Sequence, residues 1–178
     1  MMKFTLVDFQ QLVKGFPKNE EIVKWLNYTF DFYKINTPLR ISAFLARIGH
    51  ECLSFTQFEE FASGAAYEGR KDLGNIQKGD GVKYKGRGAV QITGRTNYSN
   101  LSKAFAIDFI TNPKLLLTPE WAIKSSGWFW STKNLNSLAD KGNIEGITKV
   151  INGGFNGLQD TKDRYLKCLQ WFKSKGYS

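Results

Sequence analysis

Histidine and cysteine are scarce in this chain of 178 residues, which contains His50, Cys52 and Cys168 and no other residue of either type. A single histidine excludes zinc sites built from several histidines, and it leaves a Ser-His-Asp triad dependent on one residue. The two cysteines fit no metal-binding spacing, so we expect two buried free thiols in a reducing compartment. The sequence predicts neither a metal nor a cofactor.

Long apolar runs and nucleotide-binding signatures are also missing. No stretch approaches the roughly 18 apolar residues of a spanning helix, and Asp8 interrupts the N-terminal segment where a signal peptide would lie. We therefore expect synthesis in the cytoplasm without a signal peptide, and release by a separate route if the protein acts outside. The sequence has no Gly-x-Ser-x-Gly motif and no P-loop, and Gln91 stands where a dinucleotide fingerprint needs its third glycine.

Positive charge is in excess, since 25 Lys and Arg against 16 Asp and Glu give a net charge of +9. This surplus predicts a negatively charged partner, either a nucleic acid, a membrane surface or an anionic polymer. Segment 85–92 superficially matches an RNA-recognition signature, but Arg87, Ala89 and Ile92 replace its base-stacking aromatic residues. We therefore expect no nucleic-acid partner.

Length and composition predict a single domain over residues 1–178, because 42% apolar residues suffice for a core and domains of about 100–200 residues are usual. Apolar periodicity and capping residues predict a mainly α fold. The expected helices are 6–14, 19–33, one that opens at Thr37-Pro38 and continues past Ile48, 98–105, 119–131, 143–152 and 161–175. Eight glycines between 63 and 94 exclude a helix there, and we expect a small β-hairpin or an irregular glycine-rich lobe.

The helix that opens at Thr37 carries a carboxyl at the edge of its apolar face. Glu51 lies three residues after Ile48 and seven after Phe44, which both belong to the apolar stripe. Partial burial would disfavour the charged form and raise the pKa, as a general acid at neutral pH requires. Alternatively, Glu51 only marks the exposed end of the helix. We expect the adjacent His50 to support Glu51 or a backbone carbonyl, because no nucleophile motif accompanies it.

If Glu51 were the general acid in the hydrolysis of a glycosidic bond, the reaction would need a second carboxylate. Glu59 and Glu60 follow eight and nine residues after Glu51, and Glu68 lies between Tyr67 and Gly69. Taken singly, each is more often a solvated surface charge than a catalyst. Glu68 is nonetheless well placed to face a cleft, because loops on a rigid scaffold often carry functional side chains.

An ordered set of motifs covers the chain from about Pro38 to the C-terminus. The motifs are His50-Glu51, Glu59-Glu60, Tyr67-Glu68-Gly69-Arg70, the run 84–98 with Gly86-Arg87-Gly88 and Gln91, Asn112-Pro113, Trp128-Phe129-Trp130, the Val-Ile-Asn-Gly-Gly of 150–154 and Asp163-Arg164-Tyr165. Each is weak alone, but their order and separation are specific. Together they resemble glycoside hydrolase family 19, which comprises the plant-type chitinases and related phage endolysins.

The resemblance implies a lysozyme-like, two-lobed helical fold with a cleft between the lobes, and hydrolysis of β-1,4 links with inversion at the anomeric carbon. Glu51 matches the family's general acid. Glu68 matches the water-activating base of the chitinases and Glu60 that of the endolysin relatives, and we rank Glu68 narrowly first. Thr93 matches a residue that holds the attacking water. The positions that match cleft or supporting residues are Gln91, Asn97, Asn152 and Arg164, and we expect Arg164 near the carboxylates.

Within this family the sequence favours the endolysin branch, because the disulfides and chitin-binding appendages of the plant enzymes are absent. We therefore expect a monomer that cleaves bacterial peptidoglycan, an anionic glycan polymer, in the cell wall or periplasm and has no separate wall-binding domain. The basic helix 161–175 could also contact an anionic outer membrane. The alternatives are a chitinase acting on chitin and a non-catalytic basic wall-binding domain. Phage, prophage and bacterial-toxin origins stay open, as does the bond that is cut.

Overall fold

Helices account for most of residues 2–177, which are the residues that this computed structural model describes. The α-helices are α1 (Leu6–Leu12), α2 (Glu20–Phe32), α3 (Pro38–Glu51), α4 (Asp80–Lys83), α5 (Arg95–Phe105), α6 (Pro119–Thr132), α7 (Leu135–Ala139), α8 (Ile144–Asn152) and α9 (Leu158–Ser174). Three 3-10 turns are η1 (Ala65–Tyr67), η2 (Lys71–Leu73) and η3 (Pro113–Leu117). The predicted mainly α fold is confirmed.

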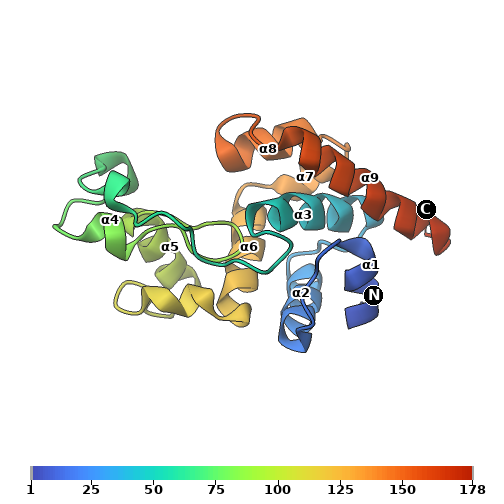
Figure 1. Cartoon of the computed structure of the whole chain (residues 1–178), viewed down its shortest axis with the longest axis horizontal. Coiled ribbons are helices and arrows are strands. Elements are labelled where there is room, and N and C mark those ends of the chain that lie inside the picture. Colours follow the sequence, from blue (N-terminus) through green and yellow to red (C-terminus); the bar gives the residue numbers. More distant parts are fainter. Residues whose placement is uncertain (1, 178) are drawn as a thin grey trace.

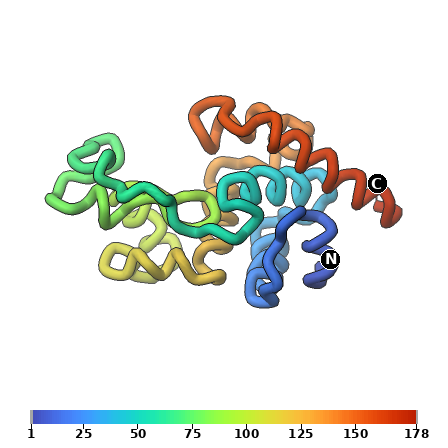
Figure 2. Tube along the Cα trace, in the orientation of Figure 1, coloured from blue at the N-terminus to red at the C-terminus, as the bar shows by residue number. Residues whose placement is uncertain are grey.

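The helices form two lobes (Figure 1). One lobe contains α1–α3 and α7–α9, the other contains α4, α5 and the three 3-10 turns, and α6 lies between them. Segments before and after the glycine-rich loop run side by side between the lobes, where Glu59 bridges Arg87 (Figure 2). Residues 52–94 therefore carry the chain from the end of α3 into the smaller lobe and back.

Capping residues fix where the long helices begin. The Thr37 side chain accepts a hydrogen bond from the backbone N–H of Arg40, and Pro38 occupies the first turn of α3. Thr118 and Pro119 repeat this arrangement at α6, and Asn19 caps α2. Each cap satisfies backbone donors that a helix start leaves open, and is worth about 1 kcal/mol. The starts of α2, α3 and α6 were readable from the sequence for this reason.

Helix α3 lies at the centre of the larger lobe, packed along α9. Its apolar stripe, which includes Phe44 and Ile48, is fully buried. The Phe44 ring meets the rings of Phe30 on α2 and Trp130 on α6 edge-on, with centroids 5.6 and 5.2 Å apart. Burying each such side chain contributes roughly 1.5–3 kcal/mol, so α3 is held firmly on three sides and its C-terminal end has a fixed position.

Of the two expected forms of the glycine-rich segment, the described residues adopt the irregular lobe and not the β-hairpin. Segment 59–94 contains only isolated bridges, between Glu59 and Arg87 and between Arg87 and Ile92, and 80–83 forms α4. Left-handed backbone at Gly88 and Gln91 interrupts any ladder after two residues. Buried Asp80 instead accepts hydrogen bonds from Arg95 at the start of α5, and this pair anchors the loop.

Other differences are local. Helix α9 begins at Leu158, three residues earlier than expected, after Gly157 with φ +72°, and the short α7 was not foreseen. Cys52 and Cys168 are free and buried, as expected. Burial raises the pKa of both thiols to about 12, so they stay protonated at neutral pH. Within residues 2–177 no helix is long and apolar enough to cross a bilayer.

Candidate active site

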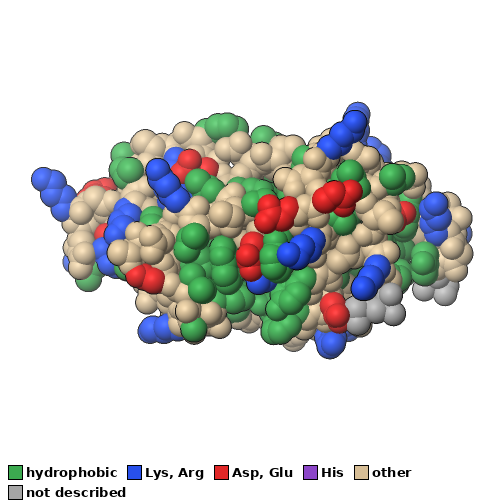
Figure 3. Space-filling model, turned by 90° about the horizontal axis from the view of Figure 1, so that it is seen from below, with side chains coloured by type: hydrophobic (Ala, Val, Ile, Leu, Met, Phe, Trp, Pro, Cys, Tyr) green, Lys and Arg blue, Asp and Glu red, His purple; other side chains and the backbone are tan. Residues whose placement is uncertain are grey.

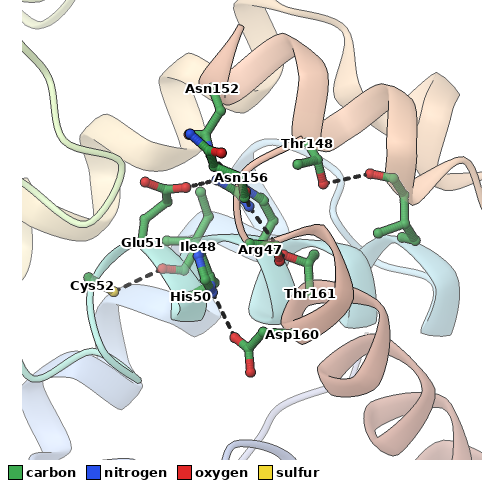
Figure 4. A network of polar contacts seen from close by, with 12 residues as sticks. Arg47, Ile48, His50, Glu51, Cys52, Thr148, Asn152, Asn156, Asp160 and Thr161 are labelled. Carbon is green, nitrogen blue, oxygen red and sulfur yellow. Dashed lines mark hydrogen bonds and ion pairs between the residues drawn. The ribbon is translucent and has the colours of Figure 1, made fainter. Parts of the chain in front are cut away.

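Glu51 is the last residue of α3, and its carboxyl is 15% exposed. It forms an ion pair with Arg47, one turn earlier on the same helix face, whose side chain is fully buried (Figure 4). Helical periodicity alone brings the two together, since residues four apart are neighbours on a helix surface. The half-buried carboxyl therefore has a charged partner and is not the freely exposed helix end that the sequence allowed.

Arg47 connects this carboxyl to the loop between α8 and α9. Its Nη1 donates to the backbone oxygen of Asn156 at 3.3 Å and to Thr161 Oγ1 at 3.2 Å. Asn152 Nδ2 donates to the same Asn156 oxygen at 3.0 Å. Burial lowers the pKa of Arg47 to about 10, partly opposed by Asp160, so the guanidinium remains charged at neutral pH.

His50 and Arg164 converge on Asp160 of α9. His50 Nδ1 lies 2.7 Å from Asp160 Oδ2, and Arg164 Nε donates to the same oxygen at 2.6 Å. Burial would raise the pKa of Asp160, but the hydrogen bonds from these two side chains outweigh it and hold the pKa below its usual value. His50 thus braces α3 against α9 through Asp160, and not through Glu51 or a backbone carbonyl as the sequence led us to expect.

Arg164 does not lie where the sequence placed it. Besides Asp160, its guanidinium donates to Ser54 Oγ at 3.0 Å, and no hydrogen bond or ion pair joins it to Glu51, Glu60 or Glu68. No contact among the described residues therefore supports the expectation that Arg164 keeps a catalytic carboxylate ionised. Arg164 instead pairs with Asp160, because Asp160 lies four residues earlier on α9 and is therefore a neighbour on the same helix face.

Glu60 lies in the segment that links the two lobes. Tyr67 Oη donates to Glu60 Oε2 at 3.0 Å, while Glu60 Oε1 is buried without a hydrogen-bond partner among the described residues. A Cβ placed on Gly86 would lie 3.1 Å from Glu60 Oε2, 2.8 Å from Gln91 Oε1 and 3.3 Å from Thr93 Oγ1. Three side-chain oxygens therefore converge around Gly86, and a side chain at this position would have to displace Gln91 Oε1.

Glu68 and Glu59 are both engaged in structural contacts. The two Glu68 carboxylate oxygens accept the backbone N–H groups of Gly79 at 2.6 Å and Gly81 at 2.8 Å, at the start of α4. Glu59 accepts a hydrogen bond from Arg87 Nε at 2.9 Å. Both Glu68 oxygens are thus occupied, whereas Glu60 keeps one free. The contacts favour Glu60 over Glu68 as the base, contrary to the narrow ranking from the sequence.

A groove with a volume of about 480 Å³ opens between α5, α6 and α8. It is lined by Leu73, residues 90–93, Asn97, Asn100, Trp128, Phe129, Thr132, Lys133, Val150 and Ile151. Three predicted cleft residues, Gln91, Thr93 and Asn97, are therefore together in it. Asn152 is absent from the lining and holds the α8–α9 loop instead. A pocket with polar side chains and aromatic rings suits a sugar chain.

Arg47 and Lys133 are candidate site residues that the sequence did not reveal, and Tyr67 was part of a motif without its contact to Glu60 being foreseen. Arg47 interrupts the apolar stripe of α3, which was the available signal, since a charged residue among buried positions needs a partner. Lys133 gave no signal of its own. Among residues 2–177 no group of three or more His, Cys, Asp or Glu side chains is arranged to hold a metal ion.

A helical two-lobed fold with one carboxyl at a buried helix end and a second in the segment that links the lobes is typical of the lysozyme-like class of glycoside hydrolases. The sequence profile described as chitinase class I matches residues 36–144. The chain thus belongs to glycoside hydrolase family 19, whose members hydrolyse O-glycosidic bonds.

Relatives in this family come from bacteria and plants. A glycosyl hydrolase family 19 domain-containing protein of Haemophilus influenzae is 34% identical over 110 residues, which are 62% of this chain and 53% of the relative. Acidic endochitinase SP2 of Beta vulgaris is 31% identical over 136 residues, 75% of this chain and 46% of the relative. The chain spans about half the length of the curated relatives it matches.

Solved structures support the fold. A bacterial family 19 chitinase superposes with a TM-score of 0.76 at 20% identity, over 96% of this chain and 95% of the other. Chitinase C from Streptomyces griseus HUT6037 gives a TM-score of 0.75 at 20% identity, over 95% and 92% of the two chains. The whole described chain, including the α8–α9 part beyond the matched profile, therefore follows the family fold.

Proposed function

We propose that this protein is an endolysin-type glycoside hydrolase that cleaves β-1,4 glycosidic bonds of bacterial peptidoglycan by an inverting general acid/base mechanism. The observation that carries the proposal is a pair of differently held carboxyls. Glu51 is fixed at the end of α3 by Arg47, whereas Glu60 keeps the buried Oε1 unpaired among the described residues. The other Glu60 oxygen, Oε2, lies around Gly86 together with side-chain oxygens of Gln91 and Thr93, which line the groove.

In this mechanism, Glu51 donates a proton to the glycosidic oxygen as the bond from that oxygen to the anomeric carbon breaks. Glu60 accepts a proton from a water that attacks the anomeric carbon from the opposite face, so the product has an inverted hydroxyl. Thr93 Oγ1, which lies around Gly86 as Glu60 Oε2 does, would orient that water. Each turnover leaves Glu51 ionised and Glu60 protonated, and proton exchange with solvent restores both.

Lys133 supports peptidoglycan as the polymer. It is the one charged side chain among the described residues that line the groove, it forms no ion pair, and its Nζ lies 5.8 Å from the Phe129 ring centroid. Alternate sugars of peptidoglycan carry a lactyl group and peptide stems with carboxylates, whereas chitin is neutral. A lysine beside an aromatic ring can pair with such a carboxylate while the ring contacts a sugar face. The net charge of +9 favours the same polymer.

Chitin is the second candidate substrate, because the matching profile is described as chitinase class I and relatives include plant endochitinases. Digesting purified peptidoglycan and colloidal chitin side by side separates the two. We expect faster release from peptidoglycan, and a several-fold higher KM for Lys133→Gln on peptidoglycan with no change on chitin oligosaccharides. Lys173→Gln, an exposed lysine of α9, is the matched control. Preference for chitin, or equal effects of Lys133→Gln on both substrates, would contradict the peptidoglycan assignment.

The exposed lysines of α9 support a further attraction to an anionic outer membrane. Tyr165, Cys168 and Phe172 are buried on one side of the helix, while Lys167 and Lys173 are exposed on the other. We propose that these lysines aid killing from outside the cell. Replacing them with glutamine should lower outside-in lysis but leave digestion of isolated walls unchanged. A monomer made in the cytoplasm and released to the wall by a separate route completes the proposal.

A further inference from the structure

Arg47 poses a chemical problem for the proposed mechanism. A general acid must be protonated to donate, yet an adjacent positive charge favours the ionised carboxylate. Arg47 is fully buried, pairs directly with Glu51 and retains its charge at neutral pH. Removing an arginine from water is costly, and a helix position on an apolar stripe would be better filled by leucine or methionine. A purely structural reason for Arg47 is therefore weak.

The contacts of Arg47 indicate what it does. One end of the guanidinium faces Glu51, and the other donates to the Asn156 backbone oxygen and to Thr161 Oγ1 (Figure 4). Gly153, Gly154 and Gly157 surround Asn156, so the backbone of this loop has few side chains of its own to hold it. No side chain of the loop forms a hydrogen bond with Glu51 among the described residues. Arg47 is thus the described link between the acid and this loop.

Resting on the proposed function, we infer that Arg47 is a positioning residue that holds the Glu51 carboxyl and the α8–α9 loop in register, and whose charge sets the alkaline limit of activity. With the guanidinium in contact, Glu51 loses its proton at a lower pH than it would beside a neutral partner. Activity then falls earlier as the pH rises. The contact with Arg47 therefore narrows the pH range of activity, but it also holds the Glu51 carboxyl in one orientation.

Other charged groups around this turn are already paired or neutral. His50 on α3 and Arg164 on α9 both bond Asp160. The α8–α9 loop contributes the neutral Asn152 and Asn156, and Cys52, which follows Glu51, keeps its proton because burial raises its pKa to about 12. Glu60, in the segment that follows, bonds Tyr67. A change of charge at position 47 therefore acts on Glu51 with the other groups left in place.

The test is the pH dependence of initial rates on solubilised peptidoglycan, between about pH 4 and pH 9, for the wild type and three variants. Arg47→Gln removes the charge, Arg47→Lys keeps it without the forked geometry, and Thr161→Val keeps it and removes one anchor. Circular dichroism checks that each is folded. We expect Arg47→Gln to lower kcat by about tenfold or more at acidic pH and to leave KM within about twofold. The alkaline limb, which is the decline of the rate at high pH, should move up by about one pH unit.

Arg47→Lys should keep the alkaline limb of the wild type with a partly recovered kcat, and Thr161→Val should keep that limb with a few-fold lower kcat. A folded Arg47→Gln with an unchanged limb, or with the kcat of the wild type, overturns the inference. If Arg47→Gln does not fold, a raised limb in Arg47→Lys or an unaltered kcat in Thr161→Val overturns it. A wild type that hydrolyses neither peptidoglycan nor chitin overturns the proposed function and this inference together, whereas an active wild type with unaffected variants overturns this inference alone.

Discussion

Two glutamates eight residues apart, Glu60 and Glu68, have opposite surroundings. Glu68 accepts two backbone N–H groups, which tie it to the start of α4. Glu60 accepts one hydrogen bond from Tyr67 and retains a buried oxygen with no partner among residues 2–177. A buried carboxylate oxygen left open is costly unless it binds something, and a water molecule is the simplest occupant.

The pair Glu60→Gln and Glu68→Gln tests this difference. We expect Glu60→Gln to lower kcat by about 10²–10⁴-fold with an unchanged melting temperature, because it removes the proton acceptor. Glu68→Gln should retain most of the activity and lose stability by about 1–2 kcal/mol, since its amide nitrogen cannot accept the second N–H. Initial rates on wall fragments and thermal unfolding measure both. A large loss of kcat in Glu68→Gln, with little loss in Glu60→Gln, would instead assign the role of base to Glu68.

For single residues, the sequence predicted their positions on helices better than it predicted their hydrogen-bond partners. The apolar spacing of α3 located Glu51 at a half-buried helix edge, because a helix repeats locally. The hydrogen bonds that separate Glu60 from Glu68 come from Tyr67, Gly79 and Gly81, and irregular backbone decides which carboxylate they reach. The contact between Arg47 and Thr161 spans 114 residues and had no local signal beyond a charge among apolar neighbours.

The α8–α9 loop is the element on which the proposed site most depends, because it receives Arg47, Asn152 and His50. Gly157 has a φ of +72°, and a Cβ there would lie 2.0 Å from His50 Nε2. A side chain at this position would displace the imidazole and break its hydrogen bond to Asp160. The loop and the end of α3 are therefore fitted to each other at a glycine.

Gly157→Ala should destabilise the protein by roughly 2–4 kcal/mol and reduce kcat, since both backbone strain and the clash with His50 act. Gly153→Ala is the matched control, because its φ is +70° but no atom lies within 4 Å of its Cβ, so about 1–2 kcal/mol from strain alone is expected. Chemical denaturation and initial rates measure the two variants. Equal losses would show that the contact between His50 and Gly157 contributes nothing.

Elements were predictable where local rules govern them. Thr37-Pro38 marked the start of α3 because caps and prolines act within one turn, and the structure has the same pair, Thr118-Pro119, at the start of α6. The hairpin prediction failed because glycines that permit a tight turn also permit left-handed backbone, which prevents strand pairing, and because Asp80 pairs with Arg95 fifteen residues away. A glycine-rich segment thus specifies where helices stop, and leaves the path between them to long-range contacts.

The two lobes and the positive charge act at the scale of the whole molecule. Glu51 ends α3 in the larger lobe, whereas Glu60 lies in the segment 52–94 that links the lobes. Hydrophobic and charged side chains both occupy the face that Figure 3 shows. A net charge of +9 produces a long-range attraction to an anionic polymer. Attraction of this kind is screened by salt, since the Debye length is about 10 Å at 0.1 M.

Raising the sodium chloride concentration should therefore raise KM for peptidoglycan several-fold and leave hydrolysis of a neutral chitin oligosaccharide unaffected. The two substrates serve as each other's controls, because salt effects on the fold or on the chemistry would change both rates equally. Initial rates at about 0.05 and 0.3 M salt measure the difference. Equal salt dependence on both substrates would show that the surplus charge does not attract the wall polymer.

The central claim is that Glu51 is the general acid of a glycoside hydrolase, and Glu51→Gln tests it most directly. The measurement is the decrease in turbidity of purified wall fragments, with circular dichroism to confirm the fold and proton NMR of the first-formed anomer in the wild type. The account predicts an inverted α-anomer from the wild type and at least an approximately hundredfold loss of rate in folded Glu51→Gln. Near-normal clearing by that variant, or a retained β-product from the wild type, would contradict it.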